Sequence, residues 1–140
     1  MTNERITVGV AFLFLGVVAY AWLKSAYQPV VPIQGAKTFI HLLHTKQFAT
    51  AHGLTLKNGY TGKTPEALEA IAHREVCTES RFVNTFPFQS NGNRVHSWVS
   101  GTEPDLSEVQ VEFDGGCLVR VSVRRTSDQW KVFYFASHAG

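Results

Sequence analysis

The stretch ITVGVAFLFLGVVAYAWL, residues 6–23, decides the architecture of this chain. Its 18 residues include no charged side chain, and ten of them are Leu, Ile, Val or Phe. As an α-helix this stretch would be roughly 27 Å long, which is close to the hydrocarbon thickness of a bilayer. We therefore predict a transmembrane helix at residues 6–23, preceded by a short N-terminal tail at residues 1–5.

The residues around the end of this run are typical of a membrane–water boundary. Tyr20, Trp22 and Tyr27 carry amphipathic rings, and Lys24 can extend its ammonium group toward lipid headgroups. Arg5 before the run balances Lys24 after it, so the positive charges favour neither orientation. The very short tail is typical of a signal anchor, so we expect a single pass through the plasma (inner) membrane and a periplasmic C-terminal domain.

Two alternatives compete with the membrane helix. A cleaved secretory signal would use Ala19-Tyr20-Ala21 as its processing site, although the bulky Trp22 that follows disfavours cleavage. A buried core helix would also be apolar, although a helix that is apolar all round is unusual at a chain terminus.

A pair of glycines gives the predicted membrane helix a candidate packing face. Gly9 and Gly16 are seven residues apart, hence about two turns, and Phe12 lies between them. Small residues let two membrane helices approach closely, so this face could hold another helix of a membrane complex. The alternative is that these glycines have no partner, because glycine is common in membrane helices.

The rest of the chain divides into a linker and one domain. Residues 24–34 contain Pro29 and Pro32, which predict an extended, semi-rigid spacer. Residues 35–140 are numerous enough to bury a core of their own. After Lys24 there are 11 Lys and Arg against 10 Asp and Glu, and this balance gives no reason to expect nucleic acid as a partner.

The two cysteines of the chain, Cys77 and Cys117, both lie in the predicted domain. In an exported domain they could form one disulfide, which requires their Cα atoms to lie within about 7 Å. Alternatively, they are two small buried apolar residues. Because they do not form a C-x-x-C motif, thiol redox catalysis is not indicated.

Apolar periodicity predicts two helices in the first half of this domain. Ala36, Phe39, Ile40 and Leu43 fall on one helical face, so we expect a helix from residue 35 to about residue 52. Thr64-Pro65-Glu66 is a typical helix start, with a capping hydroxyl, a proline and an acid in the first turn.

Beyond residue 80 the apolar period changes to two. Alternating segments at 82–88, 94–100, 109–113, 119–124 and 130–135 predict strands, and Asp114-Gly115-Gly116 predicts a hairpin turn. The predicted fold is therefore α+β, with an N-terminal transmembrane helix, two further helices and a curved antiparallel sheet of about four strands.

Two stretches resemble the nuclear-transport-factor-two-like, or cystatin-like, α+β roll superfamily. FIHLLHTKQFATAHGL (Phe39–Leu54) looks like the first helix of that family, and Trp130-Lys131-Val132 looks like its last strand. The resemblance covers roughly residues 35–138. It implies a sheet curved around a long helix and a cone-shaped cavity, in a superfamily that includes enzymes, ligand binders, scaffolds and membrane-anchored secretion components.

The sequence predicts no catalytic, cofactor-binding or metal-binding residue. The histidines His41, His44, His52 and His73 lack a Glu or Cys at a zinc-like spacing. Arg120, Arg124 and Arg125 form a candidate basic patch for an acidic partner or for anionic headgroups, or else an ordinary solvated strand face.

These features together predict a non-catalytic, single-pass membrane protein. We expect an accessory or assembly subunit of a larger membrane complex, whose partners are the bilayer and other subunits of that complex. A membrane-tethered domain that binds a small ligand is the alternative, and an enzyme of isomerase or cyclase type is the third.

Overall fold

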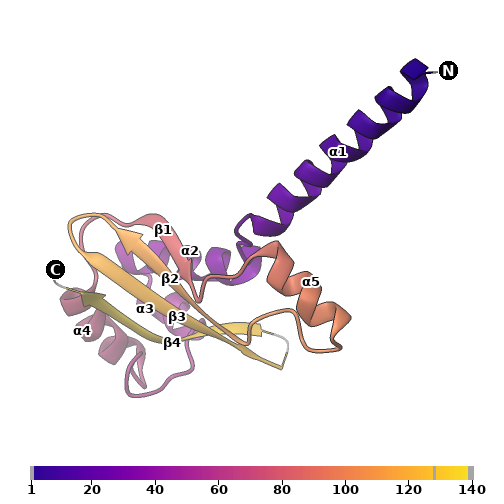
Figure 1. The fold of residues 1–140 in the computed structure, drawn as a ribbon. Helices are drawn as coiled ribbons and strands as arrows, with labels where there is room; N and C mark the ends of the chain where they lie inside the picture. Colours follow the sequence, from indigo (N-terminus) through magenta and orange to yellow (C-terminus); the bar gives the residue numbers. More distant parts are fainter. Residues whose placement is uncertain (1, 128, 139–140) are drawn as a thin grey trace. The chain divides into compact units, whose positions relative to one another are not determined.

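The computed structural model describes residues 2–127 and 129–138, with side chains described from Val8 onward. The chain forms two compact units (Figure 1). Unit 1 combines Met1–Tyr27 with Phe88–Asp105, and unit 2 combines Gln28–Pro87 with Leu106–Gly140. The predicted single domain at residues 35–140 is therefore interrupted, because residues 88–105 belong with the N-terminal segment.

Unit 1 contains two helices, α1 (Thr2–Lys24) and α5 (Asn91–Val99). Helix α1 confirms the helix predicted at residues 6–23, but it also includes most of the predicted tail. Helix α5 shows that the strand predicted at residues 94–100 is wrong. The physical reason is local, because the Ser90 hydroxyl caps a helix by accepting a hydrogen bond from the Asn93 amide at 3.1 Å.

Among the residues that the structure describes, none of the helices is both long enough and apolar enough to cross a bilayer.

Unit 2 contains a four-stranded antiparallel sheet in the order β1-β2-β3-β4. Its strands are β1 (Arg81–Phe86), β2 (Glu108–Asp114), β3 (Leu118–Thr126) and β4 (Gln129–His138). The predicted turn at Asp114-Gly115-Gly116 joins β2 to β3, and Gly116 adopts a φ of 97° that favours glycine. The predicted α+β class and the four-stranded sheet are thus confirmed.

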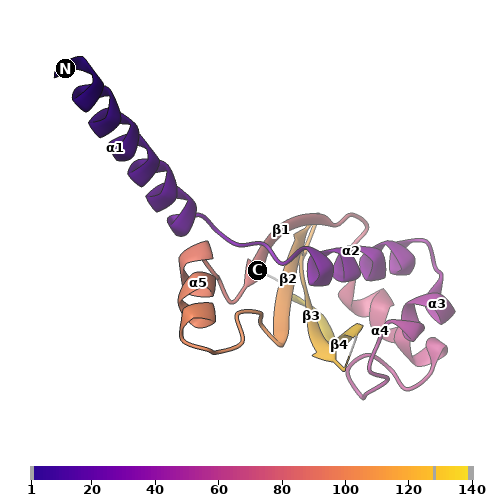
Figure 2. The same ribbon diagram turned by 90° about the vertical axis from the view of Figure 1, so that its right-hand side faces the viewer.

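Three helices of unit 2 lie along the sheet (Figure 2): α2 (Val30–His44), α3 (Phe48–Gly53) and α4 (Pro65–Glu75). The linker predicted at residues 24–34 is shorter than expected, because α2 begins at Val30. Pro29 stands at the N-cap and Pro32 in the first turn, where a backbone N–H has no helical partner to lose. The two prolines therefore start a helix instead of extending a spacer.

The helix predicted from residue 35 to about 52 is broken between α2 and α3. Lys46 has a φ of 56°. Its amide donates to the Leu43 carbonyl, and the Gln47 amide donates to the Leu42 carbonyl. This pair of bonds is the Schellman arrangement that ends helices, with lysine where glycine is usual. Helix α4 confirms its predicted start, because the Thr64 hydroxyl accepts from the Ala67 amide.

The core of unit 2 lies between the helices and one face of the sheet. Strands β2 and β3 alternate as predicted, with valines and Phe113 inward and charged residues outward. Fully or almost fully buried apolar side chains form this core: Ala36, Phe39, Ile40, Leu43, Leu68, Val109, Val111, Phe113, Val119, Val121, Val123, Val132 and Phe135.

A disulfide joins Cys77 to Cys117, with 5.9 Å between their Cα atoms. Of the two alternatives left open by the sequence, pairing is therefore the one observed. Cys77 follows α4, whereas Cys117 lies in the turn between β2 and β3. Such bonds are typical of proteins in oxidising compartments, which agrees with the predicted extracytoplasmic domain.

Candidate functional site

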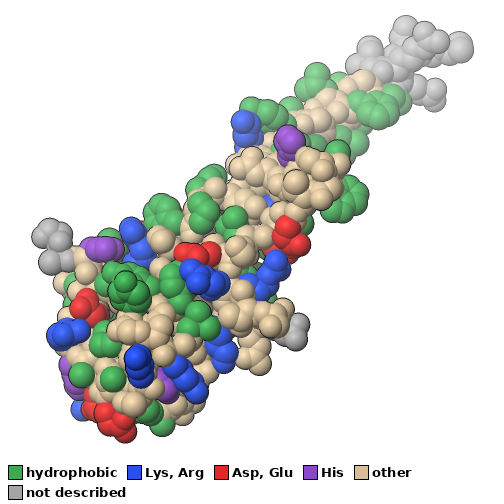
Figure 3. All heavy atoms as spheres, turned by 90° about the horizontal axis from the view of Figure 1, so that it is seen from below, with side chains coloured by type: hydrophobic (Ala, Val, Ile, Leu, Met, Phe, Trp, Pro, Cys, Tyr) green, Lys and Arg blue, Asp and Glu red, His purple; other side chains and the backbone are tan. Residues whose placement is uncertain are grey.

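The surface of α1 is the most unusual feature of the molecule. Each side chain from Val8 to Leu23 is exposed, including Phe12 at 71 %. Hydrophobic side chains therefore cover this helix along its described length (Figure 3). A continuous apolar surface of this kind marks a site of contact with protein or lipid.

The predicted packing face at Gly9, Phe12 and Gly16 lies on this exposed surface. A Cβ atom added to either glycine would meet nothing within 4 Å. Both positions are therefore open to a neighbouring helix, and no described residue of this chain fills them.

The beginning of α5 is attached to the end of α1. The Asn91 side-chain amide donates to the Trp22 carbonyl at 3.3 Å and to the Ser25 hydroxyl at 2.9 Å. The Asn91 backbone amide donates to the Ser25 carbonyl at 3.1 Å. At Gly92 a Cβ atom would lie 3.0 Å from the Leu23 carbonyl oxygen, so this position favours glycine.

The segments that flank α5 hold its other side. Arg94 is stacked 3.7 Å from the centre of the Tyr27 ring and pairs with Asp105 at 2.5 Å. The Gln89 side chain donates to the Pro104 carbonyl at 2.9 Å. These contacts fix α5 within unit 1, although none of its residues is buried.

Two of the three arginines of the predicted basic patch are neutralised by partners. Arg120 pairs with Glu112, and Arg124 pairs with Glu108 at 3.1 Å, each across the β2–β3 ladder. Arg125 follows Arg124 directly, so strand alternation directs it to the other face of the sheet. The binding of this patch to an acidic partner or to anionic headgroups stays a prediction.

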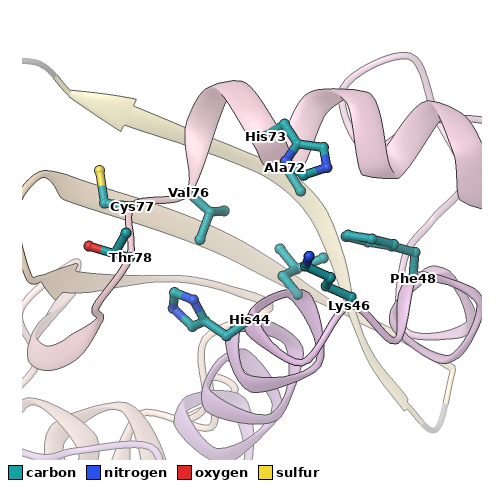
Figure 4. A pocket seen from close by; sticks show the side chains of 9 residues that line it. His44, Lys46, Phe48, Ala72, His73, Val76, Cys77 and Thr78 are labelled. Carbon is teal, nitrogen blue, oxygen red and sulfur yellow. The ribbon is translucent and has the colours of Figure 1, made fainter.

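A cleft of about 320 Å³ lies in unit 2 beside α2 and α4. Its apolar lining includes Leu43, Phe48 and Val76, while His44 and His73 reach it from different helices (Figure 4). His44 is hydrogen-bonded to the Ser80 hydroxyl at 3.0 Å, and the His73 ring lies 3.6 Å from Glu69.

The structure does not bring the histidines together as a metal site. Within residues 2–127 and 129–138, no group of three or more His, Cys, Asp or Glu side chains is arranged to hold a metal ion. The buried His52 donates instead to the Gly62 carbonyl at 3.2 Å and connects α3 to the following loop.

Several of the carboxylates that the structure describes have structural partners. Glu112 is almost buried against Arg120, and Glu75 accepts from the amide and hydroxyl of Ser137. At the start of α4, the backbone amide of Glu66 and the Thr64 hydroxyl lower the pKa of the Glu66 carboxyl. These arrangements stabilise the fold, and the enzyme alternative stays a prediction.

Comparison of the chain with known protein families, with curated proteins and with solved structures found no match. The resemblance to the α+β roll superfamily therefore stays a prediction.

Sequence reasoning missed the exposed apolar face of α5, which consists of Val95, Trp98 and Val99. The sequence does contain a signal for this helix, because these residues have the i, i+3, i+4 spacing of a helical face and Ser90 supplies a cap. The same residues also alternate with a period of two, with Val95 and Val99 on one side and Trp98 on the other, and this alternation led to the strand predicted at residues 94–100.

Proposed function

We propose that this protein is a membrane-attached, non-catalytic subunit, whose N-terminal helix lies in lipid and whose disulfide-linked α+β unit works outside the cytoplasm. The observation that carries the proposal is the apolar surface of α1, which is exposed at each position from Val8 to Leu23. In water such a surface is costly, because each buried CH₂ group contributes about 0.8 kcal/mol. Lipid is the environment that removes this cost.

The proposal includes a single crossing of the bilayer by residues 6–23. The first two residues of that run, Ile6 and Thr7, precede the first described side chain. Tyr20 and Lys24 support the assignment of the C-terminal end to the headgroup level, because the Lys24 ammonium lies 5.8 Å from the centre of the Tyr20 ring. The disulfide supports the assignment of unit 2 to an oxidising compartment.

Membrane attachment and compartment can be tested together in intact cells. The full chain should stay in the membrane pellet after alkaline carbonate treatment and should need detergent for release. Its cysteines should react with a membrane-permeant maleimide only after reduction. Release by carbonate would contradict the lipid location, and labelling without reduction would contradict the compartment.

The role as a subunit of a complex rests on the open face at Gly9 and Gly16. A partner helix on this face would be displaced by Gly9→Leu/Gly16→Leu, whereas Ala11→Leu/Ala21→Leu adds similar volume on the opposite side of α1. We expect tagged protein, extracted in mild detergent, to bring down a partner in fixed stoichiometry that only the glycine variant loses. Recovery of the unaltered chain as a lone monomer would contradict this role.

The cleft beside α2 and α4 supports a second candidate, a tethered domain that binds a small ligand. Its apolar lining and the Lys46, His44 and His73 side chains around it would suit an apolar anion. The fluorescent probe 8-anilinonaphthalene-1-sulfonate tests this directly. Saturable binding that Ala72→Trp abolishes would support a ligand site, and equal binding by the variant would contradict it.

A further inference from the structure

We infer that α5 is a second membrane contact, lying on the lipid surface with Trp98, Val95 and Val99 inserted at the boundary between headgroups and acyl chains. The inference rests on the proposed lipid location of α1. It concerns a segment that lies far from α1 in the sequence and that the proposed function does not require.

The first support is the division of α5 into two faces. At 100° per residue, Asn91, Gly92, Val95, Trp98 and Val99 fall within an arc of about 120°. The opposite side carries Asn93, His96 and Ser97, which are polar. A short helix with one apolar and one polar face is suited to the plane of a membrane interface.

The second support is the orientation of the apolar face of α5. Asn91 and Gly92 contact the end of α1 through Trp22, Leu23 and Ser25. Because these two residues share the arc of Val95, Trp98 and Val99, the apolar side of α5 is the side that is turned toward α1. The exposed surface of α5 thereby continues the exposed surface of α1 instead of facing away from it.

The third support is the level at which α5 is held. Trp22 and Lys24 mark the end of the apolar run, where aromatic rings and lysines favour the headgroup boundary. Hydrogen bonds attach Asn91 at this same level. Trp98 and Val99 are each 73 % exposed and Val95 is 38 % exposed, so the described chain leaves most of the surface of Trp98 and Val99 uncovered. Figure 1 shows that α5 turns away from the axis of α1, as an interfacial helix would.

These observations favour lipid as the occupant over a protein partner. Lipid already surrounds the adjoining part of α1 under the proposed function, so the interface is continuous and needs no additional molecule. Tryptophan is also the side chain most typical of this depth, because its ring is apolar and its N–H remains hydrated.

The test uses the full chain reconstituted in vesicles of phosphatidylcholine and phosphatidylglycerol at about 7:3. A Trp98-only protein (Trp22→Phe/Trp130→Phe) reports on α5, and a Trp22-only protein (Trp98→Phe/Trp130→Phe) reports on α1. Phosphatidylcholine brominated at the upper or lower part of its acyl chain serves as the quencher. We expect upper-chain bromine to reduce Trp98 emission at least twofold and lower-chain bromine to quench it less.

Quenching of Trp22 with unquenched Trp98 would overturn the inference and leave the proposed function intact. Failure of both tryptophans to be quenched would overturn the proposed function as well. Blue-shifted but unquenched Trp98 emission would indicate a protein cover, such as a second copy, and would also overturn the inference.

Variants that retain Trp98 as the reporter test whether the apolar face of α5 causes the contact with lipid. Val95→Asn/Val99→Asn should reduce Trp98 quenching at least twofold, whereas Val83→Asn, which alters an exposed valine of unit 2, should leave it unchanged. Helix content measured by circular dichroism verifies that the variants are folded. Equal quenching in both variants would show that the apolar face of α5 does not drive the contact.

Discussion

Loss of the disulfide should lower the free energy of unfolding of unit 2 by an amount that depends on the length of the loop that the bond closes. The bond between Cys77 and Cys117 spans a sequence separation of 40 residues. In the chain-entropy description, closing a loop of that size removes about 13 cal/mol/K from the unfolded ensemble, which is about 4 kcal/mol at room temperature. The bond should therefore stabilise the unit strongly, because the whole stability of a domain is only about 5–15 kcal/mol.

Trp130 provides an assay that is confined to unit 2. It is partly buried against the core and lies on β4, so Trp22→Phe/Trp98→Phe leaves a reporter that is insensitive to unit 1. In a non-ionic detergent, urea unfolding with a slope of about 2 kcal/mol/M would convert 4 kcal/mol into a midpoint shift of about 2 M. We expect this shift for Cys77→Ala/Cys117→Ala in the Trp130-only background.

Reduction separates the covalent bond from the packing of the two side chains. Treating the unaltered cysteines with a phosphine breaks the bond and keeps both sulfurs in place. The reasoning requires nearly the same midpoint shift as in the double alanine variant. A shift below about 0.5 M after reduction would refute the argument from loop entropy, and a large shift in the alanine variant alone would assign the effect to lost packing.

Three further substitutions probe single local features of unit 2, the first two by the same urea assay and the third by NMR. Gly62→Ala should destabilise the unit by at least about 2 kcal/mol, because the glycine has a φ of 83° and an added Cβ would lie 2.5 Å from the Leu68 amide nitrogen; an unchanged midpoint would contradict this. Lys46→Gly should stabilise the unit by up to about 1 kcal/mol, because glycine adopts the left-handed conformation at the end of α2 without strain; a loss of stability would show that the lysine side chain has a role of its own. Thr64→Val should raise the pKa of Glu66, measured by carbon NMR of its carboxyl group, because the hydroxyl favours the ionised form. Since the pKa of Glu66 is lowered by folding, its contribution to stability is present above its unfolded pKa and is lost as the pH falls through its folded pKa, so the variant should lose less stability on acidification.

The sheet could be predicted from the sequence because two signals agree there. Valines alternate with charged residues along β2 and β3, and a turn with two glycines connects them. An error of one residue in register would place Glu108 and Arg124 in the core, so this pattern allows only one register between β2 and β3. The start of α4 was equally clear, because the hydroxyl of Thr64 and the ring of Pro65 both favour the first turn of a helix.

The boundaries of α2 could not be predicted, because the residues at its two ends do not distinguish a helix end from other conformations. Pro29 and Pro32 suit an extended spacer and a first helical turn equally well. The end of the helix depends on Lys46 in a conformation that glycine usually adopts. The apolar periodicity continues past Lys46, so it does not indicate that the helix is interrupted between α2 and α3.

The connection between β1 and β2 gives the strongest argument that unit 1 has a role of its own. Antiparallel neighbours can be joined by a turn of a few residues, yet the chain between these two strands contains α5 and its flanking segments. Helix α5 contributes no buried residue to a core, and its fixed contacts in unit 1 run to the end of α1 and to its own flanks. Folding of the sheet therefore does not explain this insertion. A need to place an apolar helix at the level where α1 ends does explain it, and the quenching of Trp98 by lipid decides whether that need is membrane contact.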